Sequence, residues 1–278
     1  ETNFLVFDSG VEANQAFASG SIDFASMGNT NGIIALSRGL DVELIWLHEI
    51  LGEIEALAVR KDSGIEKVED LAGKSIATTF ASTSHYSLLQ VLNEAGIADQ
   101  VQLLDMQTVD IVAAWERGDI DAAYTWQPSL GSLLENGDML VSSEQVAAMG
   151  HQTANVLLAR KGFTEQHPEL TADFIAALIA GGNLYRENPE QAAAIVAVPL
   201  GITAENALGQ MQGSIWLTPE EEISEAYMGT SETAGDFSKV MKATADFLLE
   251  QGSITESPSQ EEFDAFINPK YIEMYLER

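Results

Sequence analysis

Short apolar runs that read as β-strands alternate along this chain with amphipathic segments that read as helices. The strand-like runs cover residues 4–7, 22–28, 42–47, 55–61, 75–81, 101–106, 120–126 and 155–161. Helical patterns cover residues 12–20, 31–39, 68–74, 84–96 and 110–118, and most of the chain from about residue 164 onward. This alternation predicts an α/β architecture in which helices flank parallel-rich sheets.

Two segments about a hundred residues apart share one pattern, in which a helix ends at Gly and an Ile-Asp pair opens a strand. The shared positions are Gly20, Ile22, Asp23 and Ala25 in the first copy and Gly118, Ile120, Asp121 and Ala123 in the second. Open α/β sheets bind ligands at the carboxyl ends of their strands. The two copies therefore favour two lobes of similar build around a ligand cleft. Two ordinary helix–strand joints in one large sheet are the alternative.

The chain is strongly acidic, with 43 Asp and Glu against 13 Lys and Arg and a net charge of −30. A nucleic acid or an anionic membrane surface would require a basic footprint, so we expect neither as a partner. An acidic surface with few Lys residues suits a salty medium, in which charge repulsion is screened. A marine or halophilic setting is one interpretation, and high solubility alone is the other.

The 278 residues include no cysteine, which excludes disulfides, thiolate nucleophiles, zinc–thiolate sites and iron–sulfur sites. The apolar runs are too short to span a membrane. The chain also opens without the basic and apolar segments of an export signal, so we expect such a signal to have been removed or never to have been present.

Residues 78–89 read TTFASTSHYSLL and combine six hydroxyl side chains with a histidine and a tyrosine. A strand is expected to end near Ala81 and a helix to begin near Ser84, with Ser82, Thr83 or Ser84 as the N-cap. Free amide groups at a helix start form an anion site. Because no Lys or Arg occurs between Lys74 and Arg117, neutral dipoles would hold the anion, which suits a sulfonate. A self-capped helix with surface serines is the alternative.

Further candidate binding residues lie at other predicted strand ends. Asn29 and Thr30 follow a strand and could offer donors from the first half of the chain, although any such turn favours Asn and Gly. Glu55 opens an apolar strand and could pair with a ligand ammonium, or could be simply solvated. Tyr124 and Trp126 end another strand, where aromatic rings could enclose a cation or could pack in the core.

Motifs for catalysis or metal binding do not occur. The histidines are scattered and show no metal-ligand spacing: His48, His85, His151 and His167. No nucleophile elbow, phosphate-binding loop or dinucleotide fingerprint is present either. We therefore expect no enzyme activity, no cofactor and no bound metal.

Several blocks together resemble the taurine-binding proteins of ABC importers, within the wider group that binds aliphatic sulfonates, nitrate and thiamine precursors. The blocks are FDSG (7–10), ASGSIDFASMGN (18–29), IEALAVRK (54–61), TTFASTSHYSLL (78–89), AAWERGDIDAAYTWQP (113–128) and SIWLTPEEE (214–222). The resemblance implies a two-lobed periplasmic binding protein of type II that closes on its ligand by hinge motion. The implied lobes are residues 1–75 with 158–278, and residues 76–157. It also implies a monomer in the periplasm that delivers a small molecule to a membrane permease.

The resemblance further implies which residues bind the ligand. The sulfonate is expected to contact hydroxyl and imidazole donors and helix N-termini, and the ammonium is expected to contact Glu55 and the aromatic residues. The implied donors are Ser82, Thr83 and His85 from one lobe and Ser9 and Asn29 from the other, with Tyr124, Trp126 and Gln127 at a strand end.

Two departures from the family pattern affect these expectations. The family begins with a further strand and helix before FDSG, so part of the site is expected to be missing. Asn155 stands where taurine binders are expected to carry Asp, which makes isethionate or another small sulfonate or sulfinate a plausible ligand. An enzyme similar to thiamine-pyrimidine synthases and a sensory ectodomain are the alternatives to a transport protein.

Overall fold

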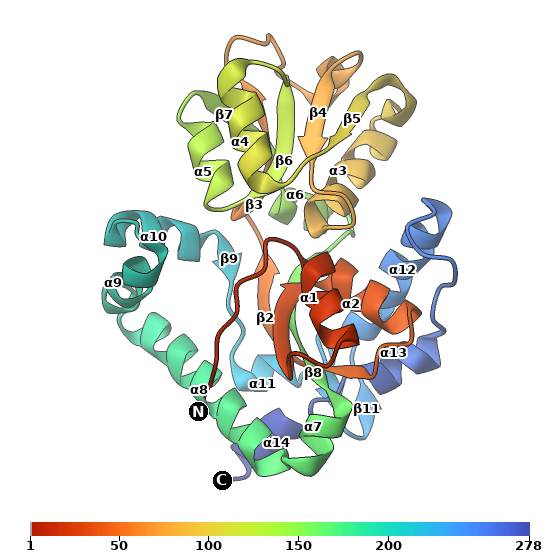
Figure 1. Ribbon diagram of the computed structural model, residues 1–278, viewed down its shortest axis with the longest axis vertical. Helices are drawn as coiled ribbons and strands as arrows, with labels where there is room; N and C mark the ends of the chain where they lie inside the picture. Colours follow the sequence, from red (N-terminus) through yellow and green to blue (C-terminus); the bar gives the residue numbers. More distant parts are fainter. Residues whose placement is uncertain (1) are drawn as a thin grey trace.

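The computed structural model describes residues 2–278 and shows two lobes, each built on its own β-sheet (Figure 1). The first sheet contains, in spatial order, β1 (Phe24–Gly28), β8 (Ala154–Arg160), β2 (Val42–Leu51) and β9 (Ser214–Ile215). The second contains β5 (Gln102–Asp105), β4 (Ser75–Thr78), β6 (Ala122–Trp126), β3 (Glu55–Arg60) and β7 (Gly137–Ser142). A small hairpin joins β10 (Gly229–Thr230) to β11 (Thr233–Ala234). This arrangement confirms the two-lobed α/β class.

Helices cover both sheets and form most of the C-terminal part of the chain (Figure 1). The helices of the N-terminal part and of the second lobe are α1 (Gly10–Ala18), α2 (Asn29–Ser37), α3 (Thr83–Glu94), α4 (Thr108–Arg117), α5 (Ser129–Leu134) and α6 (Ser143–Ala148). The others are α7 (Lys161–Gln166), α8 (Pro168–Glu187), α9 (Pro189–Leu200), α10 (Ala204–Gln212), α11 (Pro219–Glu222), α12 (Phe237–Glu250), α13 (Gln260–Phe266) and α14 (Lys270–Leu276). Within residues 2–278, no helix by itself is long and apolar enough to cross a membrane, and α9 and α10 reach that composition only as a pair bent by 110°.

The chain passes between the lobes earlier than the sequence predicts. Strand β3 follows β2 directly but pairs with β6 and β7 in the second sheet, so the crossing lies at residues 52–54 and not near 75. Strand β8 belongs to the first sheet, so the return lies just before residue 154 and not near 157. We propose these two short segments as the limits of the lobes and as the hinge between them.

The first strand after each crossing between the lobes, β3 or β8, is antiparallel to its neighbours in the sheet. Strand β3 is antiparallel to both β6 and β7, and β8 is antiparallel to both β1 and β2. Strand β4 pairs in parallel with β5 and β6, as the alternation predicts. The reason for the reversal is connectivity, because β3 and β8 enter their sheets from the other lobe and not through a helix crossover.

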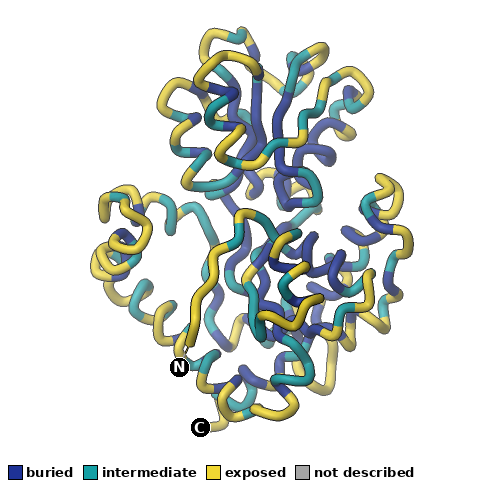
Figure 2. Tube along the Cα trace, viewed as in Figure 1, coloured by how far each residue is buried: buried dark blue, intermediate teal, exposed yellow. Residues whose placement is uncertain are grey.

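Alternating side chains of β3 build two separate cores in the second lobe. Ala56 and Ala58 face α4 and α5, where they pack around the buried ring of Trp115. Leu57 and Val59 face the opposite side and pack against α3. This period of two is the pattern of a strand that is buried on both faces. Buried residues follow the strands of both lobes in Figure 2, so the sheets form a firm frame for the loops at their ends.

The repeated Gly-x-Ile-Asp pattern occurs once in each lobe, as predicted. Gly20 and Gly118 both have positive φ, +71° and +77°, and each follows the end of a helix. Asp121 accepts a hydrogen bond from the Ser75 amide at 2.9 Å, and Asp23 pairs with Arg160. Each copy therefore ties the start of one strand to a neighbouring strand and directs the strand's far end toward the cleft.

The predicted strand at residues 4–7 is wrong. This segment runs extended alongside the first lobe but pairs with no strand of the described chain, residues 2–278 (Figure 1). Phe4 is 84% exposed and Val6 is 94% exposed. An apolar alternating run forms a strand only where a neighbour supplies backbone hydrogen bonds, and β1, at the edge of the first sheet, pairs only with β8.

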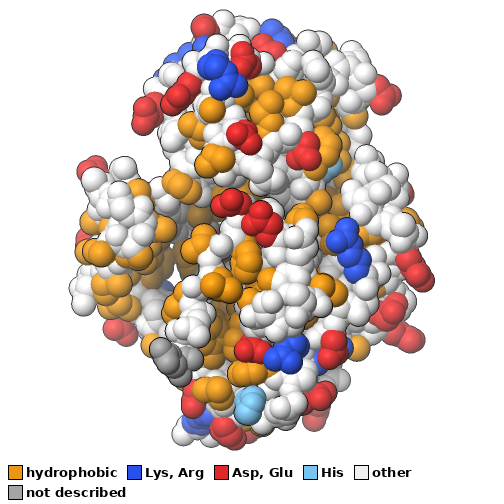
Figure 3. Space-filling model, in the orientation of Figure 1, with side chains coloured by type: hydrophobic (Ala, Val, Ile, Leu, Met, Phe, Trp, Pro, Cys, Tyr) orange, Lys and Arg blue, Asp and Glu red, His pale blue; other side chains and the backbone are white. Residues whose placement is uncertain are grey.

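The acidic run at residues 220–222 begins α11, as the sequence predicts, with a capping box between Thr218 and Glu221. Glu222, however, is fully buried and accepts the Leu47 amide on Oε2 at 2.9 Å. Burial raises the pKa of the Glu222 carboxyl well above its usual range, and the hydrogen bond from Leu47 only partly opposes this shift. Many other acidic side chains are spread over the face of the molecule that Figure 3 shows.

We expect Glu222→Gln to raise the melting temperature by several degrees at about pH 8, and by less at about pH 5. Because the pKa of Glu222 is higher in the folded protein than in the unfolded chain, wild-type stability falls as the pH rises through the folded value. Glutamine does not ionise, so the variant does not lose stability in this way as the pH rises. Thermal melts of both proteins across this pH range test it, and a difference that does not depend on pH would contradict it.

Candidate functional site

A cavity of about 1590 Å³ lies between the lobes and is lined by residues of both. It extends along the first lobe, past β1 and the segment before α1, to one face of α8. Its polar side chains toward the second lobe are Ser9, Asn31, His48, Glu49, Glu55, Thr79, Ser82, Thr83, Gln127 and Asn155. None of the lining residues is Lys or Arg within the described chain. The cavity thus combines hydroxyl, amide and carboxylate groups without a permanent cation.

The first turns of three helices meet at this cavity. Ser9 is the N-cap of α1, Gly28 is the N-cap of α2 and Ser82 is the N-cap of α3, and all three line the cavity. The first amides of a helix have no partner inside the helix, and the helix dipole adds positive potential at that end. Three such ends at one cavity form a site for an anion.

The start of α3 has the structure that the TTFASTSHYSLL segment predicts. The Ser82 hydroxyl accepts the His85 amide at 3.2 Å and donates to the Thr79 carbonyl at 2.5 Å. The next two amides, of Thr83 and Ser84, meet no acceptor within residues 2–278. Ser84 is fully buried and does not line the cavity, so the Thr83 amide is the one that stays available to a ligand, while the cap holds the turn in place.

Glu55 occupies the centre of the second lobe's side of the site and is only 1% exposed. Its Oε2 accepts the hydroxyls of Thr83 and Ser84 at 2.5 and 2.8 Å, and its Oε1 accepts the hydroxyl of Ser143 at 2.8 Å. Burial raises the pKa of the Glu55 carboxyl, and the three hydroxyl bonds oppose that shift. Glu55 joins β3 to α3 and α6, so its two oxygens are already engaged by the protein.

A second carboxylate, Glu49, lies on the first lobe's side. It is 6% exposed, lies near the end of β2 and pairs in register with Asn155 of β8. The Asn155 amide donates to Glu49 Oε1 at 2.7 Å. Burial lowers the pKa of the neighbouring His48, and the nearby Glu49 charge only partly opposes this shift. The His48 imidazole is therefore neutral at physiological pH.

Trp126 and Gln127 follow the sequence prediction and line the cavity at the end of β6. Trp126 lies opposite Glu55 in the register of β3 and β6, so its indole stands beside the buried carboxylate. The Gln127 side chain accepts the Gly131 amide at 3.0 Å, which fixes it at the rim. The structure therefore brings together seven predicted residues: Ser9, Glu55, Ser82, Thr83, Trp126, Gln127 and Asn155.

Four predicted residues do not line the cavity. Asn29 and Thr30 are fully buried within the first turn of α2, where Asn29 accepts the Ala154 amide at 3.3 Å. Tyr124 is fully buried in the core, with its hydroxyl 3.1 Å from the Ser143 hydroxyl. Tyr124 and Trp126 share one face of β6, but Tyr124 lies two residues further into the sheet, opposite Leu57, where core residues of α3 cover it.

His85 lies one turn inside α3 and stacks on the Phe80 ring at 4.3 Å. Burial lowers its pKa to about 4, while the Asp105 charge acts in the opposite direction. At neutral pH the imidazole is therefore uncharged. His85 shapes the loop before α3 and adds no positive charge to the site.

The two lobes touch directly beside the cavity. The Asn31 side chain donates to the Ala81 carbonyl at 2.9 Å, and Ala81 has the unusual φ of +60°. At Gly28, an added Cβ would lie 2.8 Å from the Thr83 methyl carbon. The absence of a side chain at Gly28 therefore allows α3 to approach the start of α2 this closely.

Comparison with known proteins places these features in a family. The family model described as NMT1/THI5 like matches residues 5–192. The chain belongs to this family. Its relatives include the taurine-binding periplasmic protein of Escherichia coli, which is 38% identical over 89% of this chain and 77% of its own length.

Solved structures of other proteins share the fold. The periplasmic aliphatic sulphonate binding protein of Escherichia coli superposes with a TM-score of 0.76 at 23% identity, covering 92% of this chain and 79% of that one. The desulfurization enzyme DSZB superposes with a TM-score of 0.61 at 19% identity, covering 92% and 86%. The first likeness confirms the periplasmic-binding-protein fold, and the second shows that an enzyme has a similar fold.

Sequence analysis missed Glu49, His48, Leu51 and Ile54, all of which line the cavity. The predicted strand ended at residue 47, whereas β2 continues to Leu51 with bulges in its pairing to β8. A signal was present, because a His-Glu pair interrupts an otherwise apolar run close to a strand's end. Polar residues at that place in an open sheet are candidates for ligand contact.

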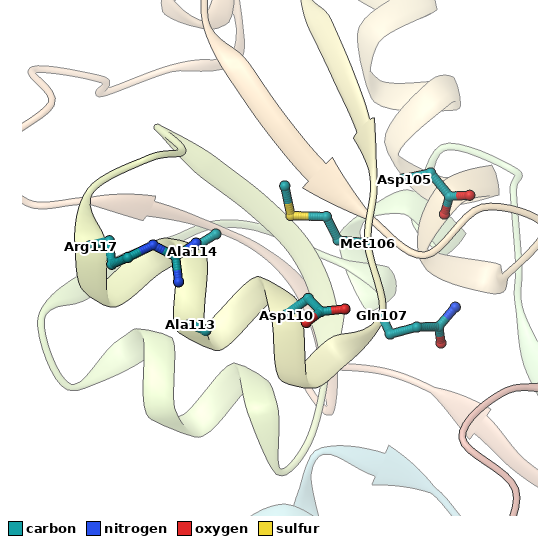
Figure 4. Close-up of a pocket in the computed structure, with 7 residues that line it drawn as sticks. All are labelled: Asp105, Met106, Gln107, Asp110, Ala113, Ala114 and Arg117. Carbon is teal, nitrogen blue, oxygen red and sulfur yellow. The ribbon is translucent and has the colours of Figure 1, made fainter.

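A separate hollow of about 400 Å³ lies on the second lobe between β5 and α4 (Figure 4). It is lined by Asp105, Gln107 and Arg117 among others and contains none of the predicted site residues. Arg117 is engaged in an ion pair with Asp119 at 2.7 Å. We assign this hollow no ligand.

Proposed function

We propose that this protein is the solute-binding component of an ABC importer and captures taurine or a closely related small sulfonate between its lobes. The observation that carries this proposal is the composition of the cavity, which is lined by three helix N-termini and by carboxylates of both lobes but by no Lys or Arg of the described chain. Relatives with the same fold are named for binding taurine and aliphatic sulphonates.

The sulfonate is expected at the start of α3. The Thr83 amide lines the cavity and has no acceptor within residues 2–278, and the dipole of a twelve-residue helix supports a negative charge there. A sulfonate is a weak base with three oxygens, so it accepts several neutral donors without taking up a proton. Binding through neutral dipoles also favours release, which a transport protein requires.

The proposal includes no turnover of the ligand. The chain has no cysteine to act as a nucleophile. The imidazole of His85 is stacked on Phe80 and lies outside the cavity lining, and the Glu55 carboxylate is held by three hydroxyls. We therefore expect the ligand to leave unchanged, in contrast to the products formed by a desulfurization enzyme with a similar fold.

We further propose that the protein works as a monomer in the periplasm and hands the ligand to a membrane permease. The crossings at 52–54 and before 154 are short, so they restrict the lobes to opening and closing about one axis. Closure on a ligand would change the outer surface near the cleft, and a permease can recognise that change.

Isothermal titration calorimetry with taurine, hypotaurine, isethionate, an alkanesulfonate and nitrate tests the proposal. We expect a dissociation constant in the micromolar range or below for taurine or another small sulfonate. Mass spectrometry of the recovered ligand should show no chemical change. Absence of binding across the panel would contradict the sulfonate assignment, and a changed ligand would contradict the assignment as a binding protein.

A further inference from the structure

We propose that Glu49, held in place by Asn155, is the carboxylate that recognises a positively charged group on the ligand. The site would thereby select zwitterionic aminosulfonates over sulfonates that lack an amine. This inference rests on the proposed function and specifies which chemical class of sulfonate the cavity takes.

Glu55 is not free for this role. Three hydroxyls already donate to its two oxygens at 2.5 to 2.8 Å, and the side chain is 1% exposed. A ligand ammonium would have to displace buried hydroxyls, of which those of Thr83 and Ser84 have no other acceptor within residues 2–278. Such an exchange loses as many hydrogen bonds as it gains.

Glu49, in contrast, has a carboxylate oxygen that is free to accept a hydrogen bond from a ligand. Its Oε1 accepts the Asn155 amide at 2.7 Å, but its Oε2 accepts no hydrogen bond from residues 2–278. The side chain is 6% exposed, and both it and Asn155 line the cavity. A carboxylate this deeply buried is costly to the protein unless a cation or several donors satisfy it.

The protein supplies no such cation. No Lys or Arg lines the cavity in the described chain, and the remaining ionisable side chains there are His48, Asp8, Asp23, Glu55 and Asp173. The nearby His48 is uncharged at neutral pH because it is buried. A ligand ammonium would therefore meet an unsatisfied carboxylate without competition, whereas a ligand with only negative charge would meet repulsion.

The two charges of such a ligand would lie on different lobes. The free amide of Thr83 belongs to the second lobe, and Glu49 belongs to β2 of the first. A zwitterion that contacts both would bridge the cleft and stabilise the closed arrangement. A sulfonate without an amine would lack the contact with Glu49.

Asn155 acts as a positioning residue in this arrangement. It lies opposite Glu49 in the strand register and donates to one carboxylate oxygen, which leaves the other directed to the ligand. The Asn155 amide donates to one of the two Glu49 oxygens but leaves the negative charge of the carboxylate in place. Asn155→Ala should therefore weaken taurine binding more than isethionate binding.

Calorimetric titration of the wild-type protein and of Glu49→Gln with taurine and with isethionate tests the inference. Glutamine keeps the shape and can still accept the Asn155 amide, but it carries no charge. The wild-type protein should prefer taurine by more than about tenfold, and the variant should bind taurine about 30- to 300-fold more weakly. Isethionate affinity should change by less than about threefold. Glu116→Gln, at an exposed position of α4 outside the cavity lining, serves as the matched control and should leave both affinities unchanged.

The outcomes separate the two proposals. Equal wild-type affinity for taurine and isethionate would overturn the inference and leave the sulfonate assignment intact, and this comparison requires no variant. Equal losses of both ligands in Glu49→Gln, with an unchanged melting temperature, would also overturn it. Binding of neither ligand by the wild-type protein would overturn the proposed function and the inference together.

Discussion

Replacing Glu55 with alanine is expected to destabilise the protein by about 3–5 kcal/mol. The substitution removes the acceptor of three buried hydroxyls, those of Thr83, Ser84 and Ser143, and leaves a cavity where the side chain stood. Each buried donor without a partner costs about 1–3 kcal/mol, and the losses share one local relaxation, so they do not add fully. Urea denaturation followed by circular dichroism measures the change.

Glu55→Gln is the control for this prediction. It retains an acceptor oxygen and the side-chain volume, so we expect a loss of less than about half of the alanine effect. A Glu55→Ala variant as stable as the wild-type protein would show that the hydroxyl cluster contributes little and that Glu55 is free to contact a ligand. Such a result would revive the sequence-based assignment of the ammonium to Glu55.

The second large effect is expected at the contact between the lobes. Gly28→Ala should weaken ligand binding by about 10- to 100-fold, because the new Cβ would lie 2.8 Å from the Thr83 methyl carbon and would hold the lobes apart. The backbone at Gly28 has φ of −60°, which alanine adopts without strain. We therefore expect the melting temperature of the unliganded protein to change little, and titration with the ligand found for the wild-type protein measures the affinity.

A second substitution tests the reason for this loss. Thr83→Ser removes the methyl group that meets the new Cβ but retains the hydroxyl that donates to Glu55. Added to Gly28→Ala, it should restore most of the affinity, while Thr83→Ser alone should change affinity only slightly. If the double variant binds as weakly as Gly28→Ala, steric separation of the lobes is not the cause.

The parts of the fold that follow from local pattern could be predicted from the sequence. The alternation of strands and helices gave the α/β class, and the glycines at positions 20 and 118 marked helix ends because both require positive φ. Ser82 could be predicted as an N-cap because capping is also local: its hydroxyl accepts the amide of His85, only three residues away.

Features that depend on distant partners could not be predicted from local pattern. The run at 4–7 alternates like a strand, but strand formation needs a neighbour that lies elsewhere in the chain. The sequence of β3 is compatible with a strand of either sheet. The crossing was therefore predicted near residue 75, although it lies at residues 52–54. The different roles of Glu49 and Glu55 depend on hydroxyl and amide donors that lie 28 to 106 residues away in the chain.

A crystal structure of the complex with taurine, with the sulfur atom located by its anomalous scattering, tests the central claim most directly. We predict the sulfonate beside the Thr83 amide at the start of α3 and the taurine nitrogen about 3 Å from the Glu49 carboxylate. The lobes should be joined through the ligand, with Glu55 still bonded to its three hydroxyls. Taurine outside the cavity, or with its nitrogen at Glu55 and its sulfonate away from α3, would contradict the account.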